Sequence, residues 1–130
     1  ESSKIGNVHI PDALWKNMLK SKKVHIEAPI KKRIKFLLND YNHMCLDEKL
    51  FEPLMIGLKK RLSVEILNCW KNLIEKKEWE KLTKSLLESH YDPAYNKNFK
   101  IKNQKIIKVI SLTEIDNNDV NNAADIIVNI

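Results

Sequence analysis

Apolar residues recur at helical spacing over most of the chain. Pro11 and Asp12 are expected to open a helix that runs to about Ser21, because proline already has the helical φ and its missing N–H group is harmless at the first helical position. Amphipathic periodicity predicts further helices over residues 30–41, 47–62, 64–75 and 78–90. Asp92, followed by proline, is expected to cap another short helix, and Asp116 a last one. The pattern therefore predicts a mostly helical chain.

Two short segments interrupt the helical pattern. Residues 24–28 alternate in polarity and end at Pro29, which is typical of a short strand. Residues 106–112 are apolar and β-branched, which indicates a second and more buried strand. Because parallel strands are normally covered on both faces, neighbouring strands are expected to precede Glu1.

The sequence thus predicts a helix-rich α/β fold in one domain or a fragment of one. Residues 1–41 and 101–130 are expected to form its α/β part, and residues 42–100 its helical part.

Charge is unevenly distributed along the chain. The sequence has 23 basic and 17 acidic residues and a net charge of +6. Basic residues dominate residues 16–35 and 97–108, whereas the segment after Val109 is acidic. Segregated charge of this kind is typical of a surface that binds an anion such as RNA, although a lysine-rich helix face is also commonly just solvated.

Several classes of site are missing from the sequence. Gly6 and Gly57 are the only glycines, so neither a P-loop nor a dinucleotide fingerprint is present. Cys45 and Cys69 lack the spacing of a disulfide framework or a zinc site, and no metal site is predicted. No apolar run approaches the ~20 residues of a membrane helix, and no signal peptide opens the chain. A cytoplasmic protein without membrane contact is expected.

The stretch from His90 to Tyr95 is the densest group of chemically active side chains. It places an imidazole, a carboxylate and two phenols at a junction between predicted helices, where they can act as a general base or bind a ligand. Asp92 can equally be only a cap, and the tyrosines only core residues with a polar tip. Glu1 and Ser2 can bind Mg²⁺ or phosphate, but a polar turn explains them as well.

A series of short motifs follows in order along nearly the whole chain. They are ES and IG within residues 1–6, HIPD at 9–12, VHIEAP at 24–29, RI at 33–34, LL at 37–38, DY at 40–41, LLE at 86–88 and HYDPAY at 90–95. In this order they resemble the C-terminal half of the tRNA 2-selenouridine synthase family. Their collinearity carries the resemblance, since each motif alone is short.

The resemblance implies a fold and an activity. The family joins a rhodanese-like domain, which bears a catalytic cysteine, to a P-loop-containing domain. This chain would then be the C-terminal portion of a P-loop NTPase-like three-layer fold with an inserted helical subdomain. The family replaces the sulfur of wobble 2-thiouridine in tRNA by selenium. Selenophosphate is the donor, and the reaction passes through an S-geranylated intermediate made from geranyl diphosphate.

The resemblance also implies candidate site residues. Glu1 and Ser2 match an acidic element where Mg²⁺ or phosphate is usually held, and with Asp92 they are the candidate catalytic residues. Charge and motif position together give the candidate substrate- and tRNA-binding residues, which are Lys22, Lys23, Lys31, Lys32, Arg33, His90, Tyr91, Tyr95, Lys97 and Lys100.

The departures from the family pattern limit what this chain can do alone. The Walker A loop, the rhodanese domain and its cysteine are missing, so the chain is expected to be an incomplete catalyst that binds no cofactor by itself. The implied partners are 2-thiouridine tRNA, a rhodanese-like domain or subunit and the P-loop-bearing portion. The chain would contribute tRNA contacts, cover for the active site and, around residues 50–79, apolar surface for the geranyl chain.

Two other classes of protein stay open at this point. One is a fragment of a different P-loop phosphotransferase, whose activity would depend on a nucleotide. The other is a non-catalytic basic helical module that binds RNA or a partner protein.

Overall fold

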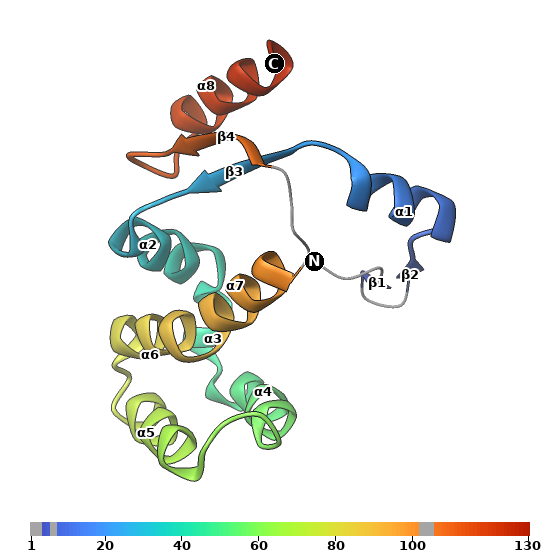
Figure 1. Cartoon of the computed structure of the whole chain (residues 1–130). Helices are drawn as coiled ribbons and strands as arrows, with labels where there is room; N and C mark the ends of the chain where they lie inside the picture. The colour runs from blue at the N-terminus through green and yellow to red at the C-terminus, as the bar shows by residue number, and fades with distance from the viewer. Residues whose placement is uncertain (1–3, 6–7, 102–105) are drawn as a thin grey trace.

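The computed structural model describes residues 4–5, 8–101 and 106–130, and it is dominated by helices (Figure 1). In chain order the elements are β1 (Lys4–Ile5), β2 (Val8–His9), α1 (Asp12–Lys20), β3 (Lys23–Glu27), α2 (Ile30–Asp40), α3 (Asn42–Leu46), the 3₁₀ turn η1 (Glu48–Leu50), α4 (Phe51–Leu58), α5 (Val64–Glu75), α6 (Trp79–Leu86), the π-helical turn η2 (Leu87–Tyr91), α7 (Asp92–Ile101), β4 (Ile106–Ser111) and α8 (Asn117–Val128). A helix-rich α/β composition, as predicted, is therefore present.

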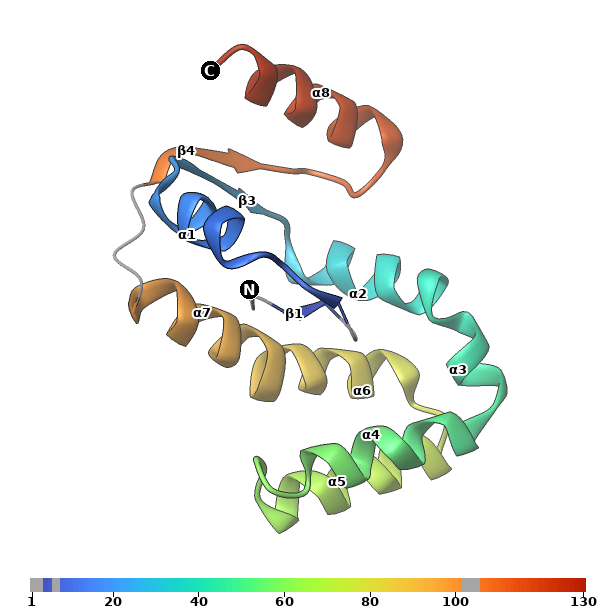
Figure 2. The same ribbon diagram turned by 90° about the vertical axis from the view of Figure 1, so that its right-hand side faces the viewer.

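The strands form two separate pairs. β1 and β2 are antiparallel, with Ile5 opposite Val8. β3 and β4 are parallel, with His25 opposite Val109 and Glu27 opposite Ser111. The two strands come from segments far apart in the sequence, and α8 lies alongside them (Figures 1 and 2).

β4 is less buried than the sequence predicts. Only Ile110 of this strand is buried, while Ile106 and Val109 are exposed. Within the described residues the strand has a single neighbour, so one edge and much of one face lack cover. α8 is also largely uncovered, because Ala123 is its only buried residue while the apolar Val120, Ile127 and Val128 are exposed.

The main hydrophobic core lies between α4, α5 and α6. Its buried members are Phe51, Leu58, Leu67, Trp70 and Leu82. Trp70 is completely buried, and its indole Nε1–H donates a hydrogen bond to Ser85 Oγ at 2.8 Å, so the polar atom of this side chain has a partner. Trp70 is therefore a fully satisfied core residue.

The helix predicted over residues 47–62 is broken into η1 and α4. Pro53 explains the break, because proline lacks the N–H group for an interior helical bond and its ring clashes with the carbonyl group four residues earlier. A proline is tolerated in the first turn of a helix, and α4 accordingly begins at Phe51.

The cap predicted at Asp92 is wrong. Its backbone is helical (φ −65°, ψ −42°), and α6, η2 and α7 follow one another as one rod (Figure 2). The N–H group of Asp92 bonds to the carbonyl of Leu87, five residues earlier, as in a π-helix. This wider turn lets the rod accommodate Pro93. Asp116, by contrast, caps α8 as predicted, since its carboxylate accepts from the N–H of Asp119 at 2.8 Å.

No helix among the described residues has the length and apolar character needed to cross a membrane.

Candidate functional site

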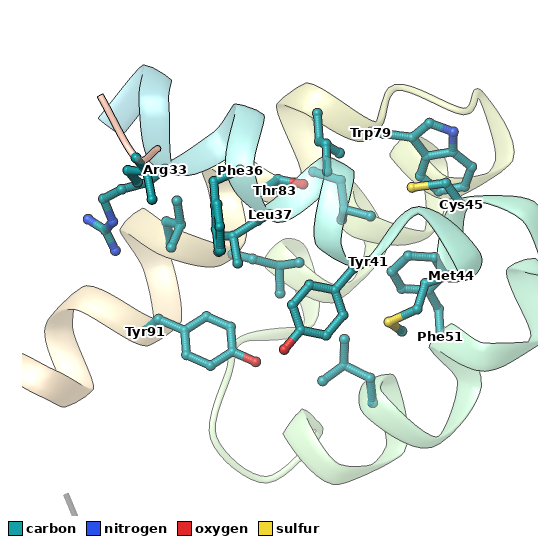
Figure 3. A pocket seen from close by; sticks show the side chains of 16 residues that line it. Arg33, Phe36, Leu37, Tyr41, Met44, Cys45, Phe51, Trp79, Thr83 and Tyr91 are labelled. Atoms are coloured by element: carbon teal, nitrogen blue, oxygen red, sulfur yellow. The ribbon is translucent and has the colours of Figure 1, made fainter. Parts of the chain in front are cut away.

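An apolar cavity of about 500 Å³ lies where α2 and α3 face α6 and η2 (Figure 3). α2 and α6 pack against each other beside it, and α4 contributes Phe51 and Leu54. Its wall is formed by Arg33, Phe36, Leu37, Leu38, Tyr41, Met44, Cys45, Phe51, Leu54, Trp79, Leu82, Thr83, Leu86, Leu87, Tyr91 and Ile115. A volume of this size is in the range of small-molecule sites, ~300–1,000 Å³.

Helical periodicity brings these side chains to one place. Arg33, Leu37 and Tyr41 are spaced four residues apart and therefore share one face of α2 and its C-terminal end. On α6, Thr83 and Leu86 likewise follow Trp79 at intervals of four and three residues. The cavity is thus the space between two helix faces that meet incompletely.

One end of the cavity carries the polar groups. Arg33 and Tyr91 lie at this end, while Trp79, Cys45 and Met44 lie at the other (Figure 3). Tyr41 and Tyr91 are half-exposed, and their hydroxyl groups point toward one another. The arrangement suits an amphipathic ligand, whose hydrocarbon part enters the apolar end and whose polar part stays near the tyrosines.

Arg33 and Asp92 form a bidentate ion pair at the polar end. Arg33 Nη1 donates to Asp92 Oδ2 at 3.0 Å, and Nη2 donates to Oδ1 at 2.6 Å. The hydrogen bond to Asp92 raises the pKa of Arg33 although partial burial opposes this, so the guanidinium stays charged. The pair joins α2 to the start of α7, and both charges are neutralised locally. Asp92 is therefore an anchor for Arg33 rather than an unpartnered carboxylate.

Of the remaining residues in the HYDPAY motif, His90 packs its ring edge-on against Tyr91, with ring centroids 5.0 Å apart. Tyr95 lies one turn further along α7, is half-exposed and does not belong to the cavity wall. The motif therefore supplies a single wall residue, Tyr91, together with the anchor for Arg33.

The basic candidates are placed differently from one another. Lys23 Nζ donates to the carbonyl of Met18 near the C-terminus of α1, and this carbonyl also accepts from the hydroxyl of Ser21 at 2.8 Å. Lys32 forms an ion pair with Glu114 in the segment between β4 and α8. Lys22 and Lys31 are exposed.

Four predicted site residues lie outside what the structure describes. Glu1 and Ser2 precede its first described residue. Lys97 and Lys100 belong to α7, but their side chains are not described.

Sequence reasoning missed most of the cavity wall, including Phe36, Tyr41 and Thr83. The apolar periodicity of α2 and of α6 was visible in the sequence, but periodicity does not show which helices face each other. Cys45, which lacks the sequence spacing of a disulfide or zinc site, also lines the cavity. Its thiol is half-buried in the wall, and burial raises its pKa, which favours the uncharged thiol over the reactive thiolate.

These features define a helix-rich α/β domain with an apolar cavity that has one polar end. The family described as the tRNA 2-selenouridine synthase AAA domain matches residues 1–123, and the chain belongs to this family. The resemblance carried by the sequence motifs is thereby confirmed, and family membership connects the chain with tRNA modification and 2-selenouridine synthesis. No curated protein and no solved structure matches the chain.

Proposed function

We propose that this chain is the part of a tRNA 2-selenouridine synthase that holds the hydrocarbon chain of the geranyl group while wobble 2-thiouridine is converted to 2-selenouridine. The apolar cavity between α2 and α6 is the observation that carries this proposal. Family membership supplies the reaction class, and the cavity supplies a site whose chemistry fits a branched hydrocarbon.

The wall of the cavity fits a geranyl chain better than it fits a nucleobase. Apolar side chains from α2, α3, α4 and α6 line it, and each methylene group moved from water into such surroundings contributes ~0.8 kcal/mol. The polar wall groups Arg33, Tyr41 and Tyr91 can face the part of the ligand that bears the diphosphate or the sulfur. Residues 50–79, where the sequence predicted the geranyl surface, supply only Phe51, Leu54 and Trp79.

The remaining machinery is proposed to come from partners. A P-loop-bearing portion would bind the diphosphate of geranyl diphosphate, with Mg²⁺ as its candidate metal, and a rhodanese-like domain or subunit would supply the cysteine. Selenophosphate and geranyl diphosphate would be the co-substrates. Within the described residues β3 and β4 pair only with each other, and their open edges support a P-loop NTPase-like sheet that continues beyond these two strands. The exposed side chains of Ile26 and Val109 leave apolar surface on the faces of the pair for further cover.

Reconstitution tests the role of the chain. The reaction would contain this chain, the P-loop and rhodanese portions, thiolated tRNA, geranyl diphosphate and selenophosphate, and nucleosides would be identified by mass spectrometry. We expect 2-selenouridine and geranylated thiouridine only when this chain is included. Equal product without the chain would contradict the proposal, and dependence on a nucleotide would point to a phosphotransferase instead.

The cavity itself is tested by a matched pair of variants. Leu37→Gln places an amide in the wall, whereas Leu46→Gln makes the same change at an exposed position in α3 outside the wall. We expect the first variant to lose affinity for geranyl diphosphate and the second to keep it, as measured by calorimetry, with helicity checked by circular dichroism. Equal affinities in the two folded variants would place the geranyl chain elsewhere.

Contact with tRNA is proposed for the exposed Lys31 in the first turn of α2. Lys31 and Lys32 are sequence neighbours, but Lys32 is held by Glu114. Lys31→Gln should therefore reduce the slope of log K against log salt by ~0.7–0.9. Lys32→Gln, the matched control, should change this slope less. An unchanged slope for Lys31→Gln would remove this residue from the tRNA interface.

A further inference from the structure

We infer that the stacked rings of Phe51 and Trp79 close the apolar end of the cavity and limit the length of hydrocarbon chain that it accepts. The inference rests on the proposed function, since it requires a hydrocarbon chain in the cavity. It adds the residues that would select a chain of one length over a longer one.

The two rings form a flat stacked pair at the end remote from the polar groups. Their centroids are 5.6 Å apart and their planes differ by 8°. Both residues belong to the cavity wall, and they lie with Met44 and Cys45 opposite Arg33 and Tyr91 (Figure 3). A chain that enters from the polar end therefore meets the aromatic pair last.

The pair cannot easily move aside for a longer chain. Phe51 is only 7% exposed and belongs to the main core with Leu82 and Trp70, and Trp79 packs against the same core. Each ring also stands at the first residue of its helix, α4 or α6, where the backbone is fixed by the helical turn that follows. Because close-packed interiors resist displacement, a longer chain would have to disrupt the core of the helical part.

Cys45 allows the opposite change at the same end of the cavity, namely a reduction of its volume. It is half-buried in the cavity wall, at the same end as Trp79 in Figure 3, and no hydrogen bond to its thiol is found among the described residues. A larger side chain at this position should fill the apolar end and shorten the accepted chain. A smaller side chain at Phe51 should therefore lengthen the accepted hydrocarbon chain, and a larger side chain at Cys45 should shorten it.

The experiment uses prenol, geraniol and farnesol, which differ by one isoprene unit at each step and carry no phosphate. Their affinities for the full chain are measured by calorimetry. The variants are Phe51→Leu and Trp79→Leu, which open the end, and Cys45→Phe, which fills it. Phe36→Leu is the matched control, because Phe36 lines the wall but is 46% exposed. Circular dichroism and thermal melting identify the variants that remain folded.

We expect the two opening variants to raise the affinity for farnesol relative to geraniol about tenfold or more, since an extra buried apolar unit is worth at least this factor in a hydrophobic pocket. Cys45→Phe should lower the affinity for geraniol relative to prenol by a similar factor, and this keeps the test decisive if Phe51→Leu does not fold. Phe36→Leu should change the affinities for all three alcohols by a similar factor.

Two outcomes would overturn the inference, and they differ in what else they overturn. If geraniol binds but the affinity ratios of the folded variants equal those of the unaltered protein, the aromatic pair does not set the length, while the proposed function stands. If geraniol fails to bind the unaltered protein, both the length limit and the assignment of the cavity to the geranyl chain are wrong.

Discussion

The ion pair between Arg33 and Asp92 should couple α2 to α7 energetically. We consider three proteins beside the unaltered chain, namely Arg33→Met, Asp92→Asn and the double variant. Methionine keeps much of the length of the arginine side chain, and asparagine keeps the shape of the carboxylate. Each single change removes one charge and leaves its partner without a counter-charge.

The size of the coupling follows from the geometry and the exposure of the pair. Two charge-assisted hydrogen bonds, at 3.0 and 2.6 Å, join the side chains, and such bonds are worth ~1.5–3 kcal/mol each when sheltered from water. The side chains are 32% and 33% exposed, so solvent screens part of this, and fully exposed pairs reach only ~0–1 kcal/mol. We therefore expect a coupling free energy of ~1–2 kcal/mol.

Urea unfolding of the four proteins gives this coupling as the non-additivity of the unfolding free energies. Arg33→Lys is the matched control, since it keeps the charge but cannot form the bidentate fork, and it should recover less than half of the coupling. If the double variant loses the sum of the two single losses within ~0.5 kcal/mol, the residues act independently. The ion pair would then not hold the two helices together.

Three further predictions concern stability. Ser85→Ala should lower the free energy of unfolding by ~1–3 kcal/mol, because the buried Nε1–H of Trp70 loses its acceptor, and a shifted indole N–H resonance should accompany the loss; an unshifted resonance would contradict it. Lys77→Gly should stabilise by ~0.5–1 kcal/mol in thermal melts, because Lys77 has φ 55° after α5, where glycine avoids the steric cost; a lower melting temperature would refute it. Hydrogen bonds from the N–H groups of Glu114 and Thr113 and from the hydroxyl of Thr113 lower the pKa of Asp119 in the folded protein. The carboxylate therefore stabilises the fold above its unfolded-state pKa of ~3.9, and this stabilisation is lost as the pH falls through the lower folded-state pKa. Stability curves of the unaltered chain and Asp119→Asn should therefore converge at acidic pH, and a gap that stays constant would count against this carboxylate.

Local features of the fold could be predicted from the sequence because their causes are local. The periodicity of residues 64–75 gives α5 with the observed bounds, and Asp116 caps α8 through a bond to a residue three positions later. The break at η1 was missed although Pro53 was visible, because the apolar pattern continues across the proline. The Asp92 cap was wrong because a π-helical turn absorbs the proline, and the residue pattern alone does not distinguish a cap from such a turn.

The candidate site depends on long-range packing, which the sequence does not specify. Arg33 and Asp92 were both predicted as site residues, but nothing local indicates that positions 59 residues apart form one ion pair. The cavity requires α2 to face α6, and the sequence shows only that each helix has an apolar face. Several candidate residues could therefore be named from the sequence, but only the tertiary structure shows how they are arranged relative to one another. Their roles in binding or catalysis stay predictions.

α2 connects the parts of the molecule, since successive positions on this helix serve different neighbours. Ile34 is buried, Lys32 reaches Glu114 beyond β4, Arg33 reaches Asp92 on α7, and Leu37 faces the cavity. A helix moves largely as a rigid body. A ligand that displaces Leu37 in the cavity wall should therefore also shift the two ion pairs at the N-terminal end of α2. The strands β3 and β4, which lie at that end of α2, would then shift when the cavity is occupied. Under the proposed function, α2 would therefore connect the bound hydrocarbon chain to the sheet, where a partner would be joined.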